Sequence, residues 1–289
     1  MTHALAAAPA ARTGHDNVGL LRLYRAELRW IFRRPRTLAV LGLLASIPVI
    51  IGIALTFVDA SETRGGQDGE LLASAVNNGF VLPVAALTMT LALLLPLASA
   101  MAGADAIAGE AAHGTLRGWL VAPVGRGRLL AIKAFGVATV STIAVLAMTF
   151  TGFVTGLIIS GTDSMSTLTG STLSVWDALG RILLVAAWVI LQLWAVGAVA
   201  LAISAFTEHP MLVVASVLAG TIVFTILGFL DAVSWLHPFL LNENWSQAPA
   251  SVLMDPLDTA MLGEGALRAA CYIAIGLSIA YARLTTRDG

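Results

Sequence analysis

Six long apolar blocks constrain the fold of this chain more than any other feature of its sequence. They cover residues 37–58, 80–101, 134–159, 182–206, 211–230 and 266–284. The hydrocarbon core of a bilayer is about 30 Å thick and a helix rises about 1.5 Å per residue, so about 20 helical residues cross it. The sequence therefore predicts an all-α integral membrane protein with six transmembrane helices.

The overall composition agrees with this prediction. Hydrophobic residues make up 58% of the 289 residues and charged residues 11%, whereas a soluble domain has about 45–50% apolar and about 25% charged residues. This balance excludes an ordinary soluble domain. The single cysteine, Cys271, cannot form an intrachain disulfide, and no cluster of Cys and His residues suggests a metal site.

The basic residues are distributed unevenly between the two sides of the predicted spans. With the N-terminus inside, thirteen of the sixteen lie on the cytoplasmic side, and only Arg64, Arg181 and Arg268 lie outside. The thirteen are Arg12, Arg22, Arg25, Arg29, Arg33, Arg34, Arg36, Arg117, Arg126, Arg128, Lys133, Arg283 and Arg287. Because cytoplasmic loops carry an excess of Lys and Arg, we predict a multi-pass protein of the cell membrane with both termini cytoplasmic.

The residues before the first span form two predicted parts. Residues 1–19 are expected to be a flexible cytoplasmic N-terminus, and residues 20–36 an interfacial amphipathic helix that is broken at Pro35. The apolar side chains of this helix can take one side, and its arginines take the other: Arg22, Arg25, Arg29 and Arg33. A basic anchor that only fixes topology is the alternative. Residues 37–284 form the six-span domain and residues 285–289 a cytoplasmic tail.

The last outer connection, about residues 231–265, is too apolar for a solvated loop. Its segment from Trp235 to Trp245 is rich in Trp, Leu and Phe, and aromatic residues of this kind are enriched at membrane interfaces. We therefore predict an outer-leaflet helical segment before the last span.

Several weaker signals lie within or beside the spans. Gly152 and Gly156 form a GxxxG pattern, which predicts close helix packing, and a polar threonine stripe facing a substrate path is the alternative. Pro48, Pro83 and Pro96 fall within the first two spans and can kink these helices. Asp177 and Arg181 are spaced at i, i+4, which predicts a local ion pair.

The inner connection between spans two and three is the most informative segment. Glu110 is followed by Gly114 and Thr115, then by a short apolar run that ends at Pro123. Gly114 permits a sharp turn, because it has no Cβ. Thr115 can cap a short helix by accepting a hydrogen bond from a free backbone N–H.

The short helix predicted after this cap is amphipathic. Leu116, Trp119 and Leu120 share one face at i, i+3 and i+4, whereas Arg117 points elsewhere. Arg126 then marks the headgroup layer at which the third span begins. Apolar side chains that project together from a short helix suit docking into a groove of a soluble partner. A loop whose arginines only set topology is the alternative.

In these residues the chain resembles the permease subunits of type-2 ABC transporters, the ABC-2 family. The family carries a Glu, then Gly-Thr, a short apolar helix, Pro and Arg between its second and third spans. The matching residues are Glu110, Gly114, Thr115, Leu116, Leu120, Pro123, Val124 and Arg126, with Gly125 where the family often has Ser. The resemblance covers nearly the whole chain, from the amphipathic N-terminal helix through six spans and the long last outer loop.

The resemblance implies that this segment is the coupling helix, which rests on an ABC ATPase subunit, the nucleotide-binding domain. The residues implied in ATPase coupling are Glu110, Gly114, Thr115, Leu116, Arg117, Trp119, Leu120, Pro123 and Arg126. The other partners implied are a second permease copy or paralogue and membrane lipids, and no nucleic acid is expected.

The ATPase must be a separate polypeptide. A Walker A motif needs a Gly-Lys-Ser/Thr sequence so that its lysine reaches the nucleotide phosphates. The only lysine of the chain is Lys133, which follows Ile132 and precedes Ala134. We therefore expect this chain to bind no cofactor and to supply no catalytic residue, with ATP and Mg²⁺ on the partner subunit.

These observations favour the permease subunit of an ATP-driven exporter. The centres of the first five spans carry no charge, which favours an apolar or amphipathic substrate and disfavours an ion-coupled carrier. The alternatives are such a carrier, or a membrane scaffold or assembly factor that binds a soluble partner without transporting a substrate.

Overall fold

The computed structural model describes most of the chain between residues 20 and 286. The described residues are 20–57, 71, 74–75, 78–112, 114, 125–161, 167 and 172–286. The predicted N-terminal segment 1–19 and most of the inner connection 113–124 lie outside them.

Helices dominate the described residues. In chain order these are α1 (Leu20–Phe32), α2 (Pro35–Leu55), α4 (Val81–Leu91), α5 (Leu94–Ala104), the π-helix η1 (Asp105–Gly109), α6 (Glu110–Ala112), α8 (Arg126–Ser160), α9 (Val175–Ser204), α10 (Pro210–Gly228), the 3-10 helix η2 (Asp231–Phe239), α11 (Gln247–Ser251) and α12 (Thr259–Thr286). Within the described ranges, five helices are long and apolar enough to cross a membrane: α2, α8, α9, α10 and α12. The bent pair formed by α4 with α5–α6 can supply a sixth span. The prediction of an all-α integral membrane protein is confirmed.

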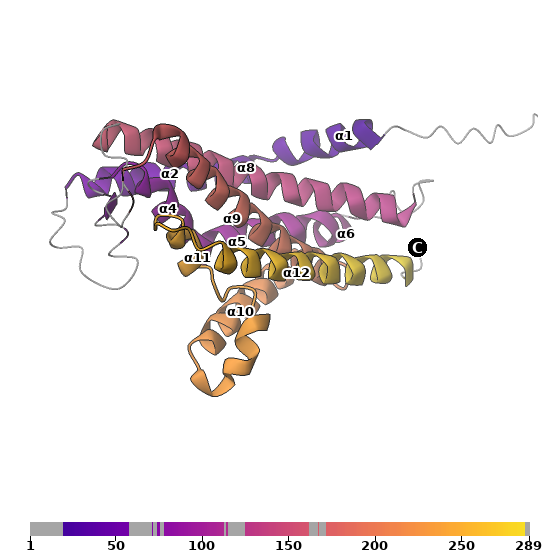
Figure 1. The fold of residues 1–289 in the computed structure, drawn as a ribbon. Coiled ribbons are helices and arrows are strands. Elements are labelled where there is room, and N and C mark those ends of the chain that lie inside the picture. The colour runs from indigo at the N-terminus through magenta and orange to yellow at the C-terminus, as the bar shows by residue number, and fades with distance from the viewer. Residues whose placement is uncertain are drawn as a thin grey trace, which may run out of the picture.

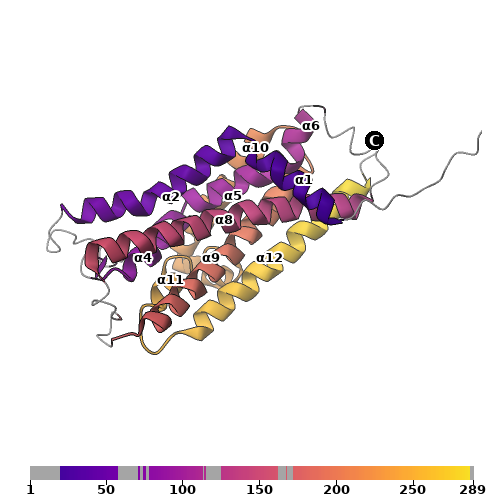
Figure 2. The ribbon, with the colours of Figure 1, turned by 90° about the horizontal axis from the view of Figure 1, so that it is seen from above.

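The long helices lie alongside one another and define two ends of a bundle (Figures 1 and 2). One end brings together α1, the start of α8 and the end of α12. We call it the basic end, and its charged side chains include those of Arg34, Arg36, Arg126, Lys133 and Arg283. The opposite end contains α11 and the connection that precedes α12.

The second span is broken beside Pro96, one of the three prolines predicted to kink the first two spans. Helices α4 and α5 meet at 58°, with Ala92 and Leu93 at the break. Pro96 explains this position, because proline lacks a backbone N–H and its ring clashes with the carbonyl four residues earlier, which is that of Ala92. Pro83 lies in the first turn of α4, where proline is tolerated, and α2 stays continuous through Pro48.

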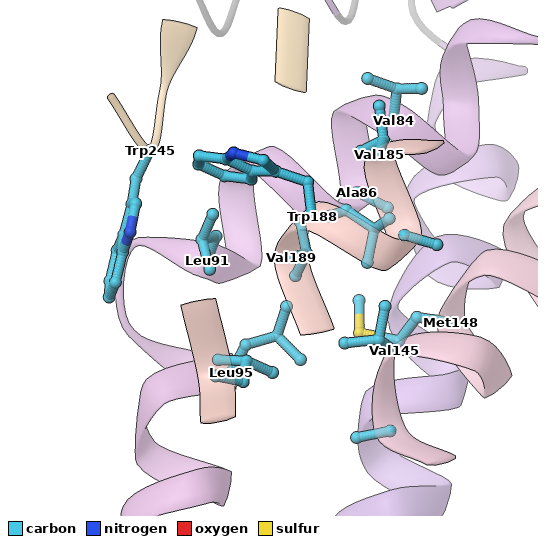
Figure 3. Packing of buried hydrophobic residues seen from close by; sticks show 14 of the residues in the cluster. Val84, Ala86, Leu91, Leu95, Val145, Met148, Val185, Trp188, Val189 and Trp245 are labelled. Carbon is cyan, nitrogen blue, oxygen red and sulfur yellow. The ribbon is translucent and has the colours of Figure 1, made fainter. Parts of the chain in front are cut away.

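The α4 half of the broken span forms the centre of the core. Nearly all its side chains are buried, and it packs against α2, α8, α9 and α11. In Figure 3, Leu91 of α4 lies near Trp188 of α9 and Trp245 of the outer connection, and Val145 and Met148 of α8 lie beyond the α9 side chains. A helix that is apolar on all sides is expected to be buried in this way.

The GxxxG pattern of α8 serves close packing. A Cβ on Gly156 would lie 2.1 Å from the carbonyl oxygen of Gly79, and one on Gly152 would lie 2.9 Å from the Cα of Pro83. Both glycines therefore let α8 approach the start of the second span at backbone distance. The packing interpretation of this pattern is confirmed.

The outer connection before α12 contains the predicted helical segment, but only its second half is buried. Helix η2 has no buried residue, and Trp235 is 71% exposed. From Leu240 onward the chain enters the bundle, and Trp245 and most of α11 are buried. Periodicity within a short apolar run cannot show which residues face the other helices.

The predicted ion pair between Asp177 and Arg181 is wrong. Arg181 instead forms an ion pair with Asp255 at 3.5 Å and donates hydrogen bonds to the carbonyls of Val252 and Met254 at 3.0 and 2.7 Å. Asp177 lies in the first turn of α9, where its backbone N–H bonds to the N-cap serine. A tertiary partner has displaced the local one.

Candidate functional site

A buried cluster of three charged side chains joins α1, α6 and α8 at the basic end. The ammonium group of Lys133 forms ion pairs with Glu27 of α1, at 3.0 Å, and with Glu110 of α6. The side chains of Lys133, Glu110 and Glu27 are 2%, 4% and 6% exposed. Removing one partner of such a buried pair costs about 3–5 kcal/mol, because it leaves an uncompensated charge. The cluster therefore fixes the relative positions of three elements.

Helix α1 is held against α8 by more than this charge contact. The rings of Tyr24 and Phe135 stack with centroids 4.4 Å apart. Gly136 lies under α1, where a Cβ would come within 2.9 Å of the Cδ1 of Ile31 and 3.3 Å of the Cγ of Glu27. The three arginines of α1, Arg22, Arg25 and Arg29, are exposed while Glu27 is buried, and the interfacial location of this helix stays a prediction.

A second charge cluster lies beside the first, where α1 joins α2. Asp105 forms ion pairs with Arg34, at 3.3 Å, and with Arg36. The guanidinium carbon of Arg34 lies 3.4 Å from the centroid of the Trp30 ring, and the ammonium nitrogen of Lys133 lies 5.3 Å from it. The indole of Trp30 therefore connects the two clusters through cation–π contacts.

The π-helix η1 places these two acidic residues. It runs from Asp105 to Gly109 and ends directly before Glu110. A π-helix interrupts the ordinary α-helical hydrogen-bond pattern, and here the N–H of Ala108 donates to the hydroxyl of Ser204 in α9 at 2.8 Å. Both ends of η1 thus carry a carboxylate that is paired with a cation from another helix.

The other side of the inner connection is anchored at the end of α12. Arg126, the first residue of α8, donates hydrogen bonds to the carbonyls of Leu284 and Thr285, the latter at 3.0 Å. A cation beside the last carbonyls of a helix is also favoured by the helix dipole. Gly114 has a φ of +72°, as expected for the predicted sharp turn.

The structure thus places three of the nine predicted coupling residues, namely Glu110, Gly114 and Arg126. The other six lie outside the described residues: Thr115, Leu116, Arg117, Trp119, Leu120 and Pro123. Glu110 and Arg126 do not meet, since each is bound to a different part of the bundle.

Sequence reasoning missed two members of the buried cluster, Glu27 and Lys133. On sequence alone, Lys133 counts only among the basic residues that set orientation, and Glu27 has no assigned role. A signal was available for each, because Lys133 is the only lysine of the chain and Glu27 is the only acidic residue between residues 20 and 36. A lone charge of the opposite sign in a basic helix indicates a specific partner.

The sequence profile of the ABC-2 family transporter proteins matches residues 21–262, from α1 to the first turn of α12. The chain belongs to the ABC-2 transporter family. As a member, it is a multi-pass membrane protein and a permease component of an ABC transporter, and the family implies an ABC ATPase as partner. A comparison with curated proteins finds no match.

The chemistry available in this ABC-2 permease site is electrostatic and mechanical. Across the part of the chain that the structure describes, no group of three or more His, Cys, Asp or Glu side chains could hold a metal ion. The cluster instead connects the inner connection to α1 and α8 on one side, while Arg126 connects it to α12 on the other.

Proposed function

We propose that this chain is the permease subunit of an ATP-driven exporter and that residues 115–124 couple it to a separate ATPase subunit. The observation that carries this proposal is the anchoring of both flanks of the segment. One flank is tied through Glu110 and Lys133 to α1 and α8, and the other through Arg126 to the end of α12. A partner that pushes on the segment would therefore move three elements together.

In this proposal the ATPase subunit binds ATP and Mg²⁺. The permease forms the substrate path and transmits the movement of the ATPase to the spans, and it supplies no catalytic residue. The state of its only lysine supports this division. Lys133 is buried between two carboxylates, so its ammonium group is engaged in the bundle and turned away from solvent. A nucleotide-binding lysine needs access to phosphate groups.

The cargo proposed for the transporter is an apolar or amphipathic molecule that moves outward. The support comes from the spans, whose charged side chains gather toward the helix ends. The charged residues Glu110 and Lys133 lie at the basic end, and Arg181 and Arg268 lie at the opposite end. An ion pathway would more often place carboxylates or histidines within the spans.

Assembly with the ATPase tests the coupling segment. Replacing a central interface Trp commonly costs about 2–4 kcal/mol, so Trp119→Ala should weaken the complex by roughly thirtyfold to nearly a thousandfold. Trp176→Ala is the matched control, because Trp176 is 80% exposed at the start of α9, at the end of the bundle opposite to the basic end. Affinity is measured by titrating the purified permease with its ATPase. Equal affinities for parent, variant and control would refute coupling through Trp119.

Glu110→Gln tests transmission separately from assembly. This variant keeps the shape of the side chain but removes its charge from the pair with Lys133. We expect the ATPase complex to form while substrate-stimulated ATP hydrolysis and transport in proteoliposomes fall. Normal assembly without any substrate-dependent hydrolysis in the parent protein would favour a scaffold. Uptake driven by a proton gradient without ATP would favour an ion-coupled carrier.

We also propose that the basic end faces the cytoplasm of the cell. The uneven distribution of basic residues supports this orientation. Single cysteines at Gly66 and Gly127, each in a Cys271→Ser background, distinguish the two sides by labelling of intact cells. A reagent that cannot cross the membrane should label position 66 and leave position 127 unlabelled. Labelling of position 127 from outside would reverse the orientation.

A second permease copy or paralogue is the remaining part of the proposal. Among the five straight span candidates, α10 is the least buried, and it projects from the side of the bundle in Figure 1. A cysteine in place of Val223, which is 50% exposed on α10, should cross-link two copies in a Cys271→Ser background. Cysteine at Leu183, 51% exposed on α9, is the control. Equal cross-linking at both positions would indicate random encounters.

A further inference from the structure

A groove at the basic end borders the two charge clusters described above. Helices α2 and α5 both pack along α8 but make few contacts with each other. Between them, beneath α1, lies an open cavity of about 40 Å³. Small side chains keep this space free, since Ala98, Ala102 and Ala106 line it at i, i+4 and i+8 along the second span.

The side chains that line the groove change from charged at its mouth to apolar at its deeper end. At its mouth it is lined by charged and aromatic side chains, among them Arg34, Arg36 and Asp105. Its deeper wall is apolar and includes Val40 of α2 and Val140 of α8. Seven residues separate Lys133 from Val140 along α8, and at 1.5 Å per residue they span about 10 Å. The groove therefore runs from the charged layer into the level of the hydrocarbon chains.

The charge at the mouth is positive. Arg34 and Arg36 share a single carboxylate, Asp105. Arg29 of α1 and Arg33, just after its end, are also exposed, whereas Glu27, the one acidic residue of α1, is buried and paired with Lys133. Clusters of arginine on an amphipathic helix next to a span attract anionic lipid headgroups.

We propose that this groove binds an anionic phospholipid. The headgroup phosphate would bind the guanidinium groups of Arg34 and Arg36, which line the mouth, and the first part of an acyl chain would lie along Val40 and Val140. A phosphate ion alone would leave the apolar wall unfilled, and an uncharged lipid would leave the second arginine charge unbalanced, because Asp105 supplies one carboxylate for two guanidinium groups. The groove shares Lys133 and Asp105 with the charge clusters, but lipid binding can be measured without the ATPase, so its failure is distinguishable from a failure of ATP coupling.

Lipid retention by the full-length permease tests the proposal. Native mass spectrometry of the detergent-solubilised protein is used to titrate phosphatidylglycerol and phosphatidylcholine of the same chain length. The parent should retain phosphatidylglycerol preferentially. The double variant R34Q/R36Q should lose about thirtyfold in affinity, at about 1 kcal/mol for each arginine near the membrane surface. R34K/R36K keeps both charges beside Asp105 and should retain most of the binding.

A matched control uses the same helix. R22Q/R25Q removes two exposed arginines of α1 that do not line the groove, and it should leave retention within about threefold of the parent. Equal retention of the two lipids, or equal losses in both glutamine variants, would overturn the proposal in favour of a diffuse charge effect.

The apolar part of the site is tested with Ala102→Leu and with Trp30 as a reporter. Trp30 lines the groove and is 37% exposed. The Trp30 fluorescence is the part of the total fluorescence that is lost in Trp30→Phe. Phosphatidylglycerol with brominated chains should quench this part. Ala102→Leu should reduce the quenching, because the larger side chain fills the groove. Unchanged quenching in Ala102→Leu, or equal competition by water-soluble glycerophosphate, would show that no chain enters the groove.

Discussion

The two ends of the bundle are held together by different chemistry. At the basic end, buried ion pairs between side chains join the helices, as for Lys133 with Glu27 and Glu110, in addition to the hydrogen bonds of Arg126 to the end of α12. At the opposite end, side chains of one helix donate hydrogen bonds to the backbone of another. Trp188 of α9 donates to the carbonyl of Leu262 in α12 at 3.0 Å.

The same pattern extends through the opposite end. Gln192 donates to the carbonyl of Gly265 at 3.1 Å, and Trp245 donates to the side chain of that glutamine at 3.2 Å. Arg268 and Tyr272 of α12 donate to the carbonyls of two consecutive residues of the outer connection, at 3.1 and 2.9 Å. Irregular backbone at membrane depth is tolerated only where its polar groups are satisfied within the protein.

This difference suits the proposed function, in which one end of the bundle is fixed and the basic end transmits the movement of the ATPase. Backbone hydrogen bonds hold a particular chain conformation, so the outer connection is fixed residue by residue. The ion pairs of the basic end hold whole helices by single side chains, so the helices can shift together. Substitutions of charge should therefore act mainly at the basic end, and substitutions of size or hydrogen bonding at the opposite end.

The largest expected effect is that of Lys133→Met. This substitution leaves Glu27 and Glu110 buried without their cation, and it should destabilise the protein by about 3–5 kcal/mol. The measurement is thermal unfolding of the purified permease followed by size-exclusion chromatography. The triple variant Glu27→Gln, Lys133→Met and Glu110→Gln removes all three charges and should recover much of the loss. A triple variant no more stable than the single one would contradict the electrostatic account.

The second largest loss of stability is expected where the backbone of α8 contacts the start of the second span. Gly156→Ala would place a methyl group 2.1 Å from the carbonyl oxygen of Gly79, so α8 and the start of the second span must separate. We expect a loss of about 2–3 kcal/mol in thermal unfolding, toward the upper part of the usual range for overpacking. Gly42→Ala is the control, since no atom lies within 4 Å of its added Cβ. Equal midpoints for the two variants would show that the close approach costs nothing.

A smaller effect is expected from a single hydrogen bond at the opposite end. Trp245→Phe keeps an aromatic ring in the core but leaves the side-chain oxygen of Gln192 without its indole donor. The expected cost is about 1–2 kcal/mol, visible as faster amide hydrogen exchange in residues 240–253. Trp235→Phe, at a position 71% exposed, should leave that exchange unchanged. If only the Trp235 variant changed the exchange, the first half of the outer connection, and not residues 240–253, would be the buried half.

The smallest effect is expected from the exposed ion pair of the opposite end. Asp255 is about half exposed, and such pairs contribute about 0–1 kcal/mol. Asp255→Asn should therefore shift the thermal midpoint little, and salt should reduce the difference further. Arg181→Gln should cost more, because it also removes the donors to two backbone carbonyls. A larger loss from Asp255→Asn would mean that the charge matters more than these hydrogen bonds.

The predictions from sequence succeeded where the deciding interaction lies within one segment. The break at Ala92–Leu93 follows from the covalent structure of Pro96, and the positive φ of Gly114 follows from a turn that favours glycine. The coupling role of Trp119 stays a prediction, because that residue lies outside the described ones. The pairing of Asp177 with Arg181 failed, since helical spacing shows which residues can meet and not whether a distant residue competes for them.

The sequence by itself determined the membrane class, the long apolar helices and the membership in the ABC-2 family, because these depend on block length, composition and local motif. Only the tertiary structure decided which charges meet. Glu27 and Lys133 are 106 residues apart in the chain, and no periodicity within either helix specifies the other. Their pairing depends on α1 packing over Gly136 of α8. The physical reason is that burial makes an unpaired charge costly, so the packed helices select partners that local sequence leaves open.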